Sequence, residues 1–305
     1  MKQKNLVIFS LALSLFAGFV SCKKEKTSDS GNTEISTHSD DQSVFSAEVD
    51  AATDDANIVL EAAALYSSRE MGADTTVCGG EITWDLTANP AVITITYNGS
   101  NCGSRKRSGS VTVAMDKGAQ WKNAGATVTI TYNNLKITRL WDQKSITING
   151  SQTYTNVSGG LLAKLSSQQP VTHTIVSDGL SITFDNGTQR TWKVAKKRVF
   201  TYDNGIVISV SGNHTEGSVE NVAEWGTNRY GAAFTTATVA PLVIRQDCDF
   251  RLTSGTVKHD VAGVSVTATF GLDASGNPVA CPDNFFYKVV YTGPNGTSIS
   301  FILPY

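Results

Sequence analysis

The chain has 305 residues, of which 40% are hydrophobic, enough to bury a sizeable core. Its 25 basic and 27 acidic residues nearly balance. This composition lacks the dense basic surface that binds nucleic acid, and that class of partner is excluded.

The first 21 residues have the pattern of an export signal. Lys2 and Lys4 precede an uncharged, mostly apolar run over residues 5–21, and no second such run follows. A membrane-spanning helix needs about 20 apolar residues, so this run is too short to be one. We therefore predict a signal peptide over residues 1–21 that is removed on export.

A cysteine stands where the signal ends. Phe19-Val20-Ser21-Cys22 resembles the lipobox of bacterial lipoproteins, in which the thiol is acylated and the signal is cut before it. The alternative is a stray cysteine within an ordinary signal. We predict lipidation of Cys22, since two or more acyl chains anchor a protein stably in a membrane. Residues 23–26 lack the aspartate that retains many lipoproteins at the inner membrane, so the resemblance implies the outer membrane, at its periplasmic face or the cell surface.

Charge is unevenly distributed along the mature chain. Removing Lys2 and Lys4 with the signal leaves 23 bases against 27 acids, a net charge of −4. Residues 23–70 hold 11 acids and 4 bases, whereas residues 71–305 hold 16 acids and 19 bases. The anchored end is therefore acidic and the rest slightly basic.

Two segments precede the main domain. Residues 22–43 are rich in Ser, Thr, Asp and Lys, a composition that predicts a flexible tether. Residues 44–70 place apolar side chains on roughly one helical stripe, with acids toward the start, which predicts a helix.

Residues 71–305 alternate apolar and polar side chains, rich in Ile, Val, Thr and Tyr, as half-buried strands do. Asn-Gly or Asp-Gly dipeptides between such runs predict hairpin turns. The sequence therefore predicts an all-β domain, an antiparallel meander of about 14 to 17 strands that forms a sandwich or an open twisted half-barrel. The dipeptides are Asn98-Gly99, Asn149-Gly150, Asp178-Gly179, Asn186-Gly187, Asn204-Gly205 and Asn295-Gly296.

Two basic triplets interrupt this pattern, Arg105-Lys106-Arg107 and Lys196-Lys197-Arg198. We expect each to lie in a solvated loop or an edge strand, where lysine blocks sheet-to-sheet aggregation.

The remaining thiols are Cys78, Cys102, Cys248 and Cys281. In an exported chain four thiols indicate two disulfides, with three connectivities open. Pairing in sequence order, Cys78 with Cys102 and Cys248 with Cys281, keeps each bridge local and is favoured. A zinc site would need close Cys or His spacings that the chain lacks, so no metal is expected.

Two stretches resemble a group of β-rich lipoproteins of Bacteroidota. One is CGGEITWDLTANPAVITITYNGSNCGSRKRSGSVTV, residues 78–113; the other is CDFRLTSGTVKHDV with NPVACPDNFFYKVVY, between residues 248 and 291. The resemblance covers most of residues 77–303, and its motifs are structural. It implies an exported, lipidated, β-rich protein and no particular activity.

Catalytic motifs for nucleophilic, phosphate-binding and metal-dependent enzymes do not occur, so no cofactor is expected. His259-Asp260 could be half of a triad, although neighbours on a strand face opposite ways. The acid pairs Asp247/Asp249 and Glu220/Glu224 could serve glycoside hydrolysis if they faced each other across a cleft.

Tryptophans offer a different kind of site. Trp121 and Trp225 lie in segments that look like loops, and exposed aromatic rings can stack on sugars. The alternative is core packing. We take both as candidate ligand-binding residues, with a glycan or an envelope protein as partner.

The sequence thus predicts a lipid-anchored envelope protein that binds or serves as structure and is not an enzyme. One alternative is a carrier of lipid or another apolar ligand, which needs apolar side chains on an open concave face and which a fully packed interior would exclude. The other is a carbohydrate-acting enzyme.

Overall fold

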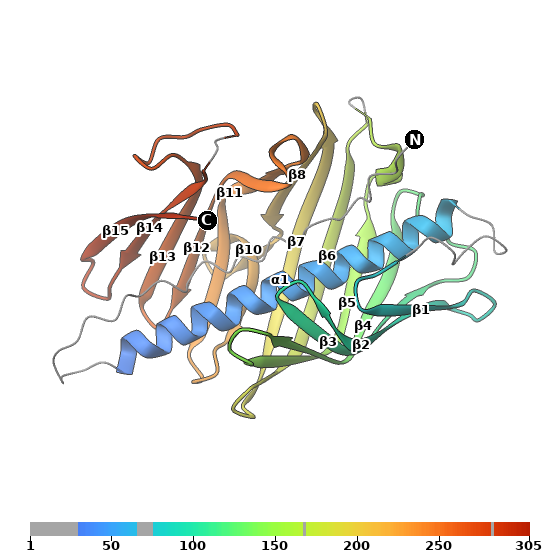
Figure 1. Cartoon of the computed structure of the whole chain (residues 1–305), viewed down its shortest axis with the longest axis horizontal. Helices are drawn as coiled ribbons and strands as arrows, with labels where there is room; N and C mark the ends of the chain where they lie inside the picture. The colour runs from blue at the N-terminus through green and yellow to red at the C-terminus, as the bar shows by residue number, and fades with distance from the viewer. Residues whose placement is uncertain (1–29, 66–75, 167–168, 282–283) are drawn as a thin grey trace.

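The computed structural model describes residues 30–65, 76–166, 169–281 and 284–305. The predicted signal peptide, Cys22 and the last part of the predicted helix, residues 66–70, lie outside these ranges. The described residues form one long helix and a 15-stranded antiparallel sheet (Figure 1), which confirms the all-β prediction with a single N-terminal helix.

Helix α1 spans Ser30–Leu65 and precedes all the strands. The strands are β1 Gly80–Asp85, β2 Ala91–Cys102, β3 Arg105–Met115, β4 Ala126–Arg139, β5 Ser145–Asn156, β6 Val171–Phe184, β7 Gln189–Tyr202, β8 Ile206–Gly212, β9 His214–Glu216, β10 Val219–Thr227, β11 Ala233–Arg245, β12 Arg251–Val261, β13 Val264–Leu272, β14 Phe286–Thr292 and β15 Ser298–Pro304. Short 3-10 turns at Leu162–Lys164 and Gln246–Cys248 complete the described elements.

Most strands pair with their neighbours in the chain, as expected of a meander. The order runs from β1 to β7, then β10 to β15, so β1 and β15 are the two edges. Two strands lie between β7 and β11, and each of them, β8 and β10, pairs with both β7 and β11. The short β9 pairs with β10.

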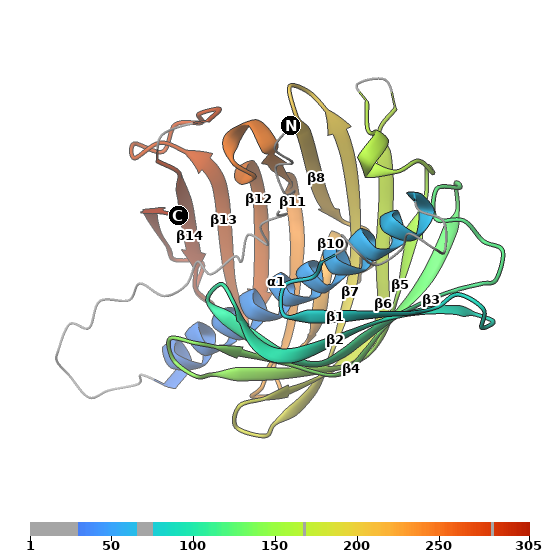
Figure 2. The same ribbon diagram turned by 45° about the vertical axis from the view of Figure 1, so that its right-hand side comes forward.

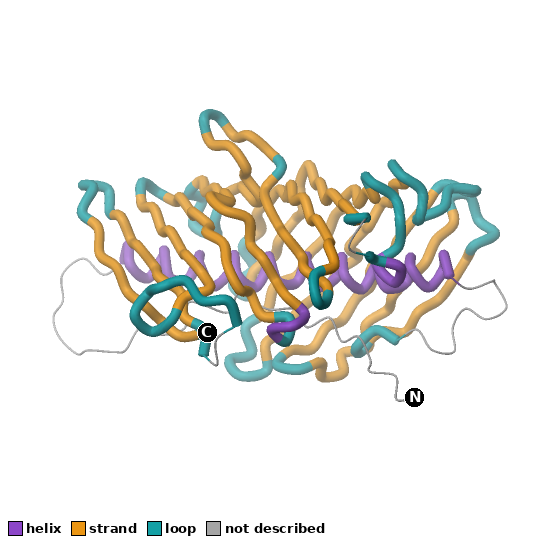
Figure 3. The backbone as a smooth tube through the Cα atoms, turned by 90° about the horizontal axis from the view of Figure 1, so that it is seen from above, coloured by secondary structure: helices purple, strands orange, loops and turns teal. Residues whose placement is uncertain are grey.

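The sheet is a single curved layer, so the half-barrel is the correct alternative and the sandwich is not. Strands β1 to β4 curl forward past α1, whereas β11 to β14 stand behind its first turns (Figure 2). Seen from above, α1 runs lengthwise through the trough that the sheet forms (Figure 3). The concave face of the sheet is therefore the face that meets the helix.

The helix begins earlier than predicted, and the predicted tether over residues 22–43 is wrong from Ser30 onward. His38, Ser39 and Gln42 are buried although none is apolar. Gln42 donates to Glu224 at 2.7 Å, and the ring of His38 packs against aromatic rings of the sheet, Trp192 and Phe234 among them. A prediction of disorder from composition takes only the burial of apolar residues into account. It fails for this segment because polar residues are buried there by contacts with strands that are distant in the sequence.

Half of the predicted turns are β-bulges instead. Asn186-Gly187, Asn204-Gly205 and Asn295-Gly296 join consecutive strands. Asn149-Gly150 and Asp178-Gly179 lie within β5 and β6, where the pairing register shifts. Asn98-Gly99 likewise lies within β2 at a register shift. Bulges bend a strand and increase its twist, and here they lie in long strands that wrap around α1.

Two apolar clusters form the core. The larger packs the middle and end of α1, including Phe45, Val49 and Leu60, against β2 to β7 and also against Phe234 of β11 and Val261 of β12. The smaller lies on β12 to β14 and includes Val266, Phe270 and Val289; its contact with α1 is Ile35. The helix thus fills one half of the trough far more completely than the other.

Candidate functional site on the concave face

The interface between α1 and the sheet is charged. Helix α1 carries no lysine or arginine, and its acids meet bases that point inward from the strands and loops. Glu48 lies 2.7 Å from Arg105 and 2.8 Å from Arg107. The pairs between the helix and the strands and loops of the sheet are Asp40–Arg139, Asp40–Lys144, Asp41–Arg229, Glu48–Arg105, Glu48–Arg107, Asp50–Lys196, Asp50–Arg198, Asp54–Arg198 and Asp55–Arg107.

These pairs correct the expectation for the two basic triplets. Both lie in central strands, β3 and β7, not in loops or edges. Because side chains alternate along a strand, the first and third residues of each triplet reach α1 while the middle residue faces away. Lys197, the middle residue of the second triplet, is exposed. The acidic N-terminal segment and the slightly basic body are therefore two sides of one interface.

Lys196 is the most fully bonded of these bases. Its ammonium group lies 2.7 Å from Glu224, 2.9 Å from Asp50 and 3.0 Å from Ser46. Three acceptors match the three donors of an ammonium group. Burial lowers the pKa of Lys196, but Asp50 and Glu224 outweigh it and raise the pKa overall. The lysine stays charged and has no donor left over.

The acids of α1 respond to burial in different ways. Burial raises the pKa of Asp54 to about 6 even though Arg198 lies 2.6 Å away. Burial acts on Asp50 in the same direction, but Lys196 and Arg198 together lower its pKa below the usual value. Two cations at one carboxylate outweigh its desolvation, and one does not.

Trp121 lies in the packed half, and the expectation that it is exposed is wrong. It is 1% exposed, its indole nitrogen donates to Asn57 at 3.2 Å, and its ring tilts against Tyr154 and His173. The loop-like sequence around it is real, but the loop folds inward because Asn156 donates to the backbone carbonyl of Trp121.

The other half of the trough contains a cleft. It lies between residues 39–50 of α1 and strands β7, β8 and β10 to β13, and its volume is about 90 Å³. Its polar floor is formed by groups such as Lys196 and Glu224, and its apolar wall by Val210, Ala223, Leu242, Val257, Val266 and Ala268.

The apolar wall continues from the cleft to the edge of the sheet. Residues directly opposite on antiparallel strands project to the same face. One row of opposed residues is Thr238, Val257, Ala268, Val289 and Phe301, and the next is Thr236, His259, Val266, Tyr291 and Ile299. We call these two rows the apolar strip.

The outer end of the apolar strip is exposed. Phe301 is 48% exposed and Ile299 is 52% exposed, and Leu303 beside them is 39% exposed. Strand β15 carries no charge and is exposed throughout, which is unusual for an edge strand. The apolar strip thus runs from exposed side chains on β15, over Val266, Ala268 and Val289, which are each 6% exposed, to the cleft under α1.

His259 is a polar side chain within the apolar strip, as are Thr236 and Thr238 at its inner end. It is 9% exposed, its Nδ1 lies 2.8 Å from the hydroxyl of Thr236, and its Nε2 has no partner among the described residues. Burial lowers the pKa of His259 to about 4, so the ring is neutral at pH 7. It forms no hydrogen bond to Asp260, which pairs with Lys258 instead. The half-triad considered from sequence is not assembled.

Trp225 lies on the outer face of β10, half-buried. The ring of His214 stacks on it at 4.1 Å with an interplanar angle of 5°, and Lys193 lies 5.9 Å from its centroid. An open pocket beside it includes Glu216 and Asp260. One face of the indole is already covered, so stacking of a sugar ring from that side is blocked.

In each acid pair suggested for glycoside hydrolysis, the two carboxylates lie in different environments. Glu224 is buried and bound to Lys196, while Glu220 is exposed. Asp247 lies 2.8 Å from Arg245, and Asp249 is exposed.

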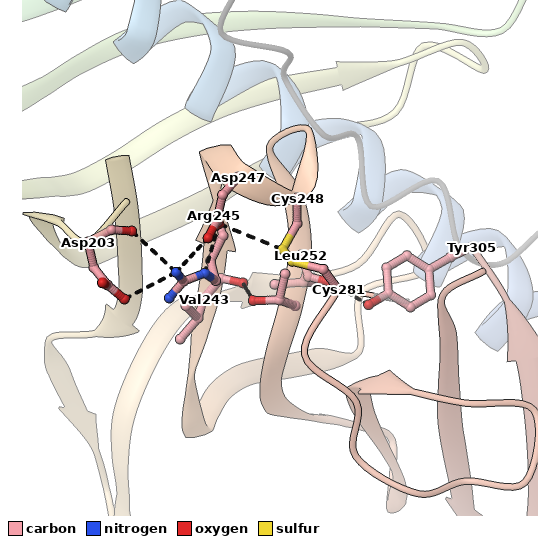
Figure 4. Close-up of a disulfide and its surroundings, with 9 residues drawn as sticks. Asp203, Val243, Arg245, Asp247, Cys248, Leu252, Cys281 and Tyr305 are labelled. Atoms are coloured by element: carbon pink, nitrogen blue, oxygen red, sulfur yellow. Dashed lines mark hydrogen bonds and ion pairs between the residues drawn. A yellow bond between two sulfur atoms is a disulfide. The ribbon is translucent and has the colours of Figure 1, made fainter. Parts of the chain in front are cut away.

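Both disulfides pair in sequence order, as favoured. Cys78 bonds to Cys102 and Cys248 to Cys281, with Cα atoms 5.8 and 5.5 Å apart. Figure 4 shows the second bridge beside Arg245, which also reaches Asp203. Asp247 lies close to both sulfur atoms, but the thiols are bonded to each other and cannot act as thiolate ligands of a metal.

No helix among the described residues is both long and apolar enough to span a bilayer. No protein-family model, curated protein or solved structure matches the chain.

Proposed function

We propose that the protein is a lipid-anchored envelope protein, held at the outer membrane by an acylated Cys22, which binds an apolar ligand on the concave face of β11 to β15 without turnover. The observation that carries this proposal is the apolar strip, which joins an enclosed cleft to an exposed edge. The exposed outer end of the strip, with Ile299 and Phe301, supplies the apolar side chains on an open face that the sequence sets as the condition for a carrier.

The difference between the two halves of the trough supports this choice. Over β2 to β7 the helix packs against a closed core, and no ligand could enter without displacing it. Over β12 to β14 only Ile35 of α1 joins the apolar cluster. Contiguous exposed apolar surface usually marks a binding site.

A glycan-binding role at Trp225 has weaker support, because His214 already covers one face of the ring. A catalytic role also has weaker support, because Lys196 and Arg245 bind the candidate carboxylates.

Binding can be tested with N-phenyl-1-naphthylamine, an uncharged dye that fluoresces in apolar sites. The full mature chain should enhance its fluorescence. Phe301→Asp places a charge on the apolar strip and should weaken binding about tenfold or more, since an ionised group resists desolvation. Ser300→Asp is the matched control, because Ser300 precedes Phe301 on β15, is also exposed, and faces the other side. No dye binding, or equal weakening by both substitutions, would contradict the proposal.

The anchor is tested separately. Cys22→Ala should abolish incorporation of radiolabelled palmitate and leave the protein unprocessed or soluble. Label that still enters the variant would overturn lipidation at Cys22 and leave the binding test untouched.

A further inference from the structure

The apolar strip contains one polar side chain that the fold leaves unused. His259 is more than nine-tenths buried, lines the cleft and has no partner for Nε2 among the described residues. A buried polar group without a hydrogen bond costs about 1–3 kcal/mol. Its neighbours on the strip, Val257 and Val266, are apolar and offer no such bond. A ligand atom in the cleft could supply the missing partner.

The ring can act as either donor or acceptor. Its Nδ1 bonds to the hydroxyl of Thr236, which can donate to Nδ1 or accept from it. When the hydroxyl donates, Nε2 carries the proton and can donate to a ligand carbonyl. When Nδ1 donates, Nε2 is an acceptor for a ligand hydroxyl. Thr236 therefore allows His259 to bind an uncharged oxygen of either kind.

The rest of the cleft disfavours a charged ligand group. A carboxylate would need a cation with free donors, and the three donors of Lys196 are occupied by Ser46, Asp50 and Glu224. The two carboxylates at that lysine would repel a further negative charge. Neutral imidazole at His259 offers no compensating charge, since burial keeps its pKa near 4. A buried charge without a partner is strongly unfavourable.

We infer that the cleft takes an uncharged acyl derivative, such as an ester of a long-chain acid, with its carbonyl oxygen hydrogen-bonded to Nε2 of His259 and its chain along the apolar strip toward β15. This inference rests on the proposed function and adds to it the class of ligand and the residue that recognises it. It distinguishes an acyl ester from the free acid of the same chain length.

The test compares methyl dodecanoate with dodecanoate at pH 8, each displacing N-phenyl-1-naphthylamine from the full mature chain. The wild-type protein should bind the ester at least about tenfold more tightly than the acid. His259→Phe keeps a ring of similar shape and should weaken ester binding about fivefold, the value of one hydrogen bond. His173→Phe is the matched control, because His173 is also buried, has its Nδ1 bonded to the hydroxyl of Tyr154 and does not line the cleft, and the substitution should leave ester binding unchanged.

The outcomes separate the two proposals. Failure of the dye to bind would overturn the proposed function. Dye binding with equal affinity for ester and acid, or equal ester binding by wild type and His259→Phe, would overturn the inference alone. If His259→Phe does not fold, the wild-type protein labelled with 15N-histidine still decides the matter: methyl dodecanoate should shift the Nε2 resonance of His259, and an unchanged resonance would contradict the inference.

Discussion

In the half of the trough formed by β1 to β7, bases from β3, β4 and β7 reach acids of α1, and a continuous apolar cluster closes around the helix. In the half formed by β8 to β15, residues 39–50 of α1 border a cleft, and the apolar strip leads from buried side chains beside the cleft to an exposed edge. The same alternating strands built both halves. The two halves differ in how far α1 covers the concave face. Where the helix covers it, the face contributes to the stability of the fold; where it does not, the face remains available to a ligand.

In the covered half, buried arginine and lysine side chains form close, specific contacts with acids of α1. Arg198 bonds Asp50 and Asp54, and it lies in the same strand as Lys196. Replacing such groups with apolar ones of equal volume is often tolerated, but removing one partner leaves a buried charge uncompensated. The covered half should therefore respond strongly to single substitutions, and the open half weakly.

The largest effect is expected for Trp121→Ala. The substitution leaves a cavity in the packed half and removes the hydrogen bond to Asn57, which should lower the free energy of unfolding by about 4 kcal/mol. Trp225→Ala is the control, a half-exposed tryptophan on the outer face, and should cost about 1 kcal/mol. Urea denaturation followed by circular dichroism measures both, and similar losses would contradict the assignment of Trp121 to the core.

Arg198→Ala should lower the free energy of unfolding by about 3 kcal/mol, because Asp54 loses its cation and Asp50 keeps only Lys196. Lys197→Ala removes the same charge one residue earlier, from the exposed face, and should change stability by less than about 0.5 kcal/mol. Chemical denaturation of both variants at low and moderate salt would test this. A large loss for Lys197→Ala would show that net charge, and not the contact with α1, sets the effect.

His38 marks the boundary between the halves and should make stability depend on pH. Burial lowers the pKa of His38 to about 3, and neither ring nitrogen has a partner among the described residues. Below pH 6.5 the unfolded chain gains a proton at His38 that the folded chain does not, so the folded state loses about 1.4 kcal/mol per pH unit down to about pH 3. Asp54, with its pKa raised to about 6, acts in the opposite direction below pH 6.

Comparing the wild type with His38→Phe isolates the contribution of His38 to the pH dependence of the free energy of unfolding, since the contribution of Asp54 is common to both proteins. Between pH 7 and pH 5 the wild type should lose about 2 kcal/mol more than the variant. Urea denaturation at the two pH values gives the difference directly. Equal losses would mean that His38 is protonated, or solvated, in the folded protein.

The smallest effect on stability is expected at the open edge. Phe301→Ser should change the free energy of unfolding by less than about 0.5 kcal/mol, because the side chain is 48% exposed. The same substitution should weaken binding of N-phenyl-1-naphthylamine severalfold, as apolar contact area is lost. A loss of stability without a loss of binding would place Phe301 in the core instead of the ligand surface.

The strand pattern was readable from sequence because alternation and turn residues are local properties. Sequence-order pairing of the cysteines also follows from their local spacing. The helix start was not readable, because residues such as His38 and Gln42 are buried by partners far along the chain. For the same reason Arg105 and Lys196 gave no sign of facing inward, and only their alternation with Lys106 and Lys197 could have suggested it. His259 was noticed for its neighbour Asp260, whereas its partner is Thr236 across the sheet.

Hydrogen exchange of the full mature chain, followed by mass spectrometry with and without methyl dodecanoate, tests the central claim most directly. Bound ligand should slow exchange in peptides covering β12 to β15, residues 251–304, and leave β2 to β5, residues 91–156, unchanged. Protection confined to β2 to β5, equal protection of both halves, or no protection at a concentration that displaces N-phenyl-1-naphthylamine would contradict the assignment of the open half as the ligand-binding surface.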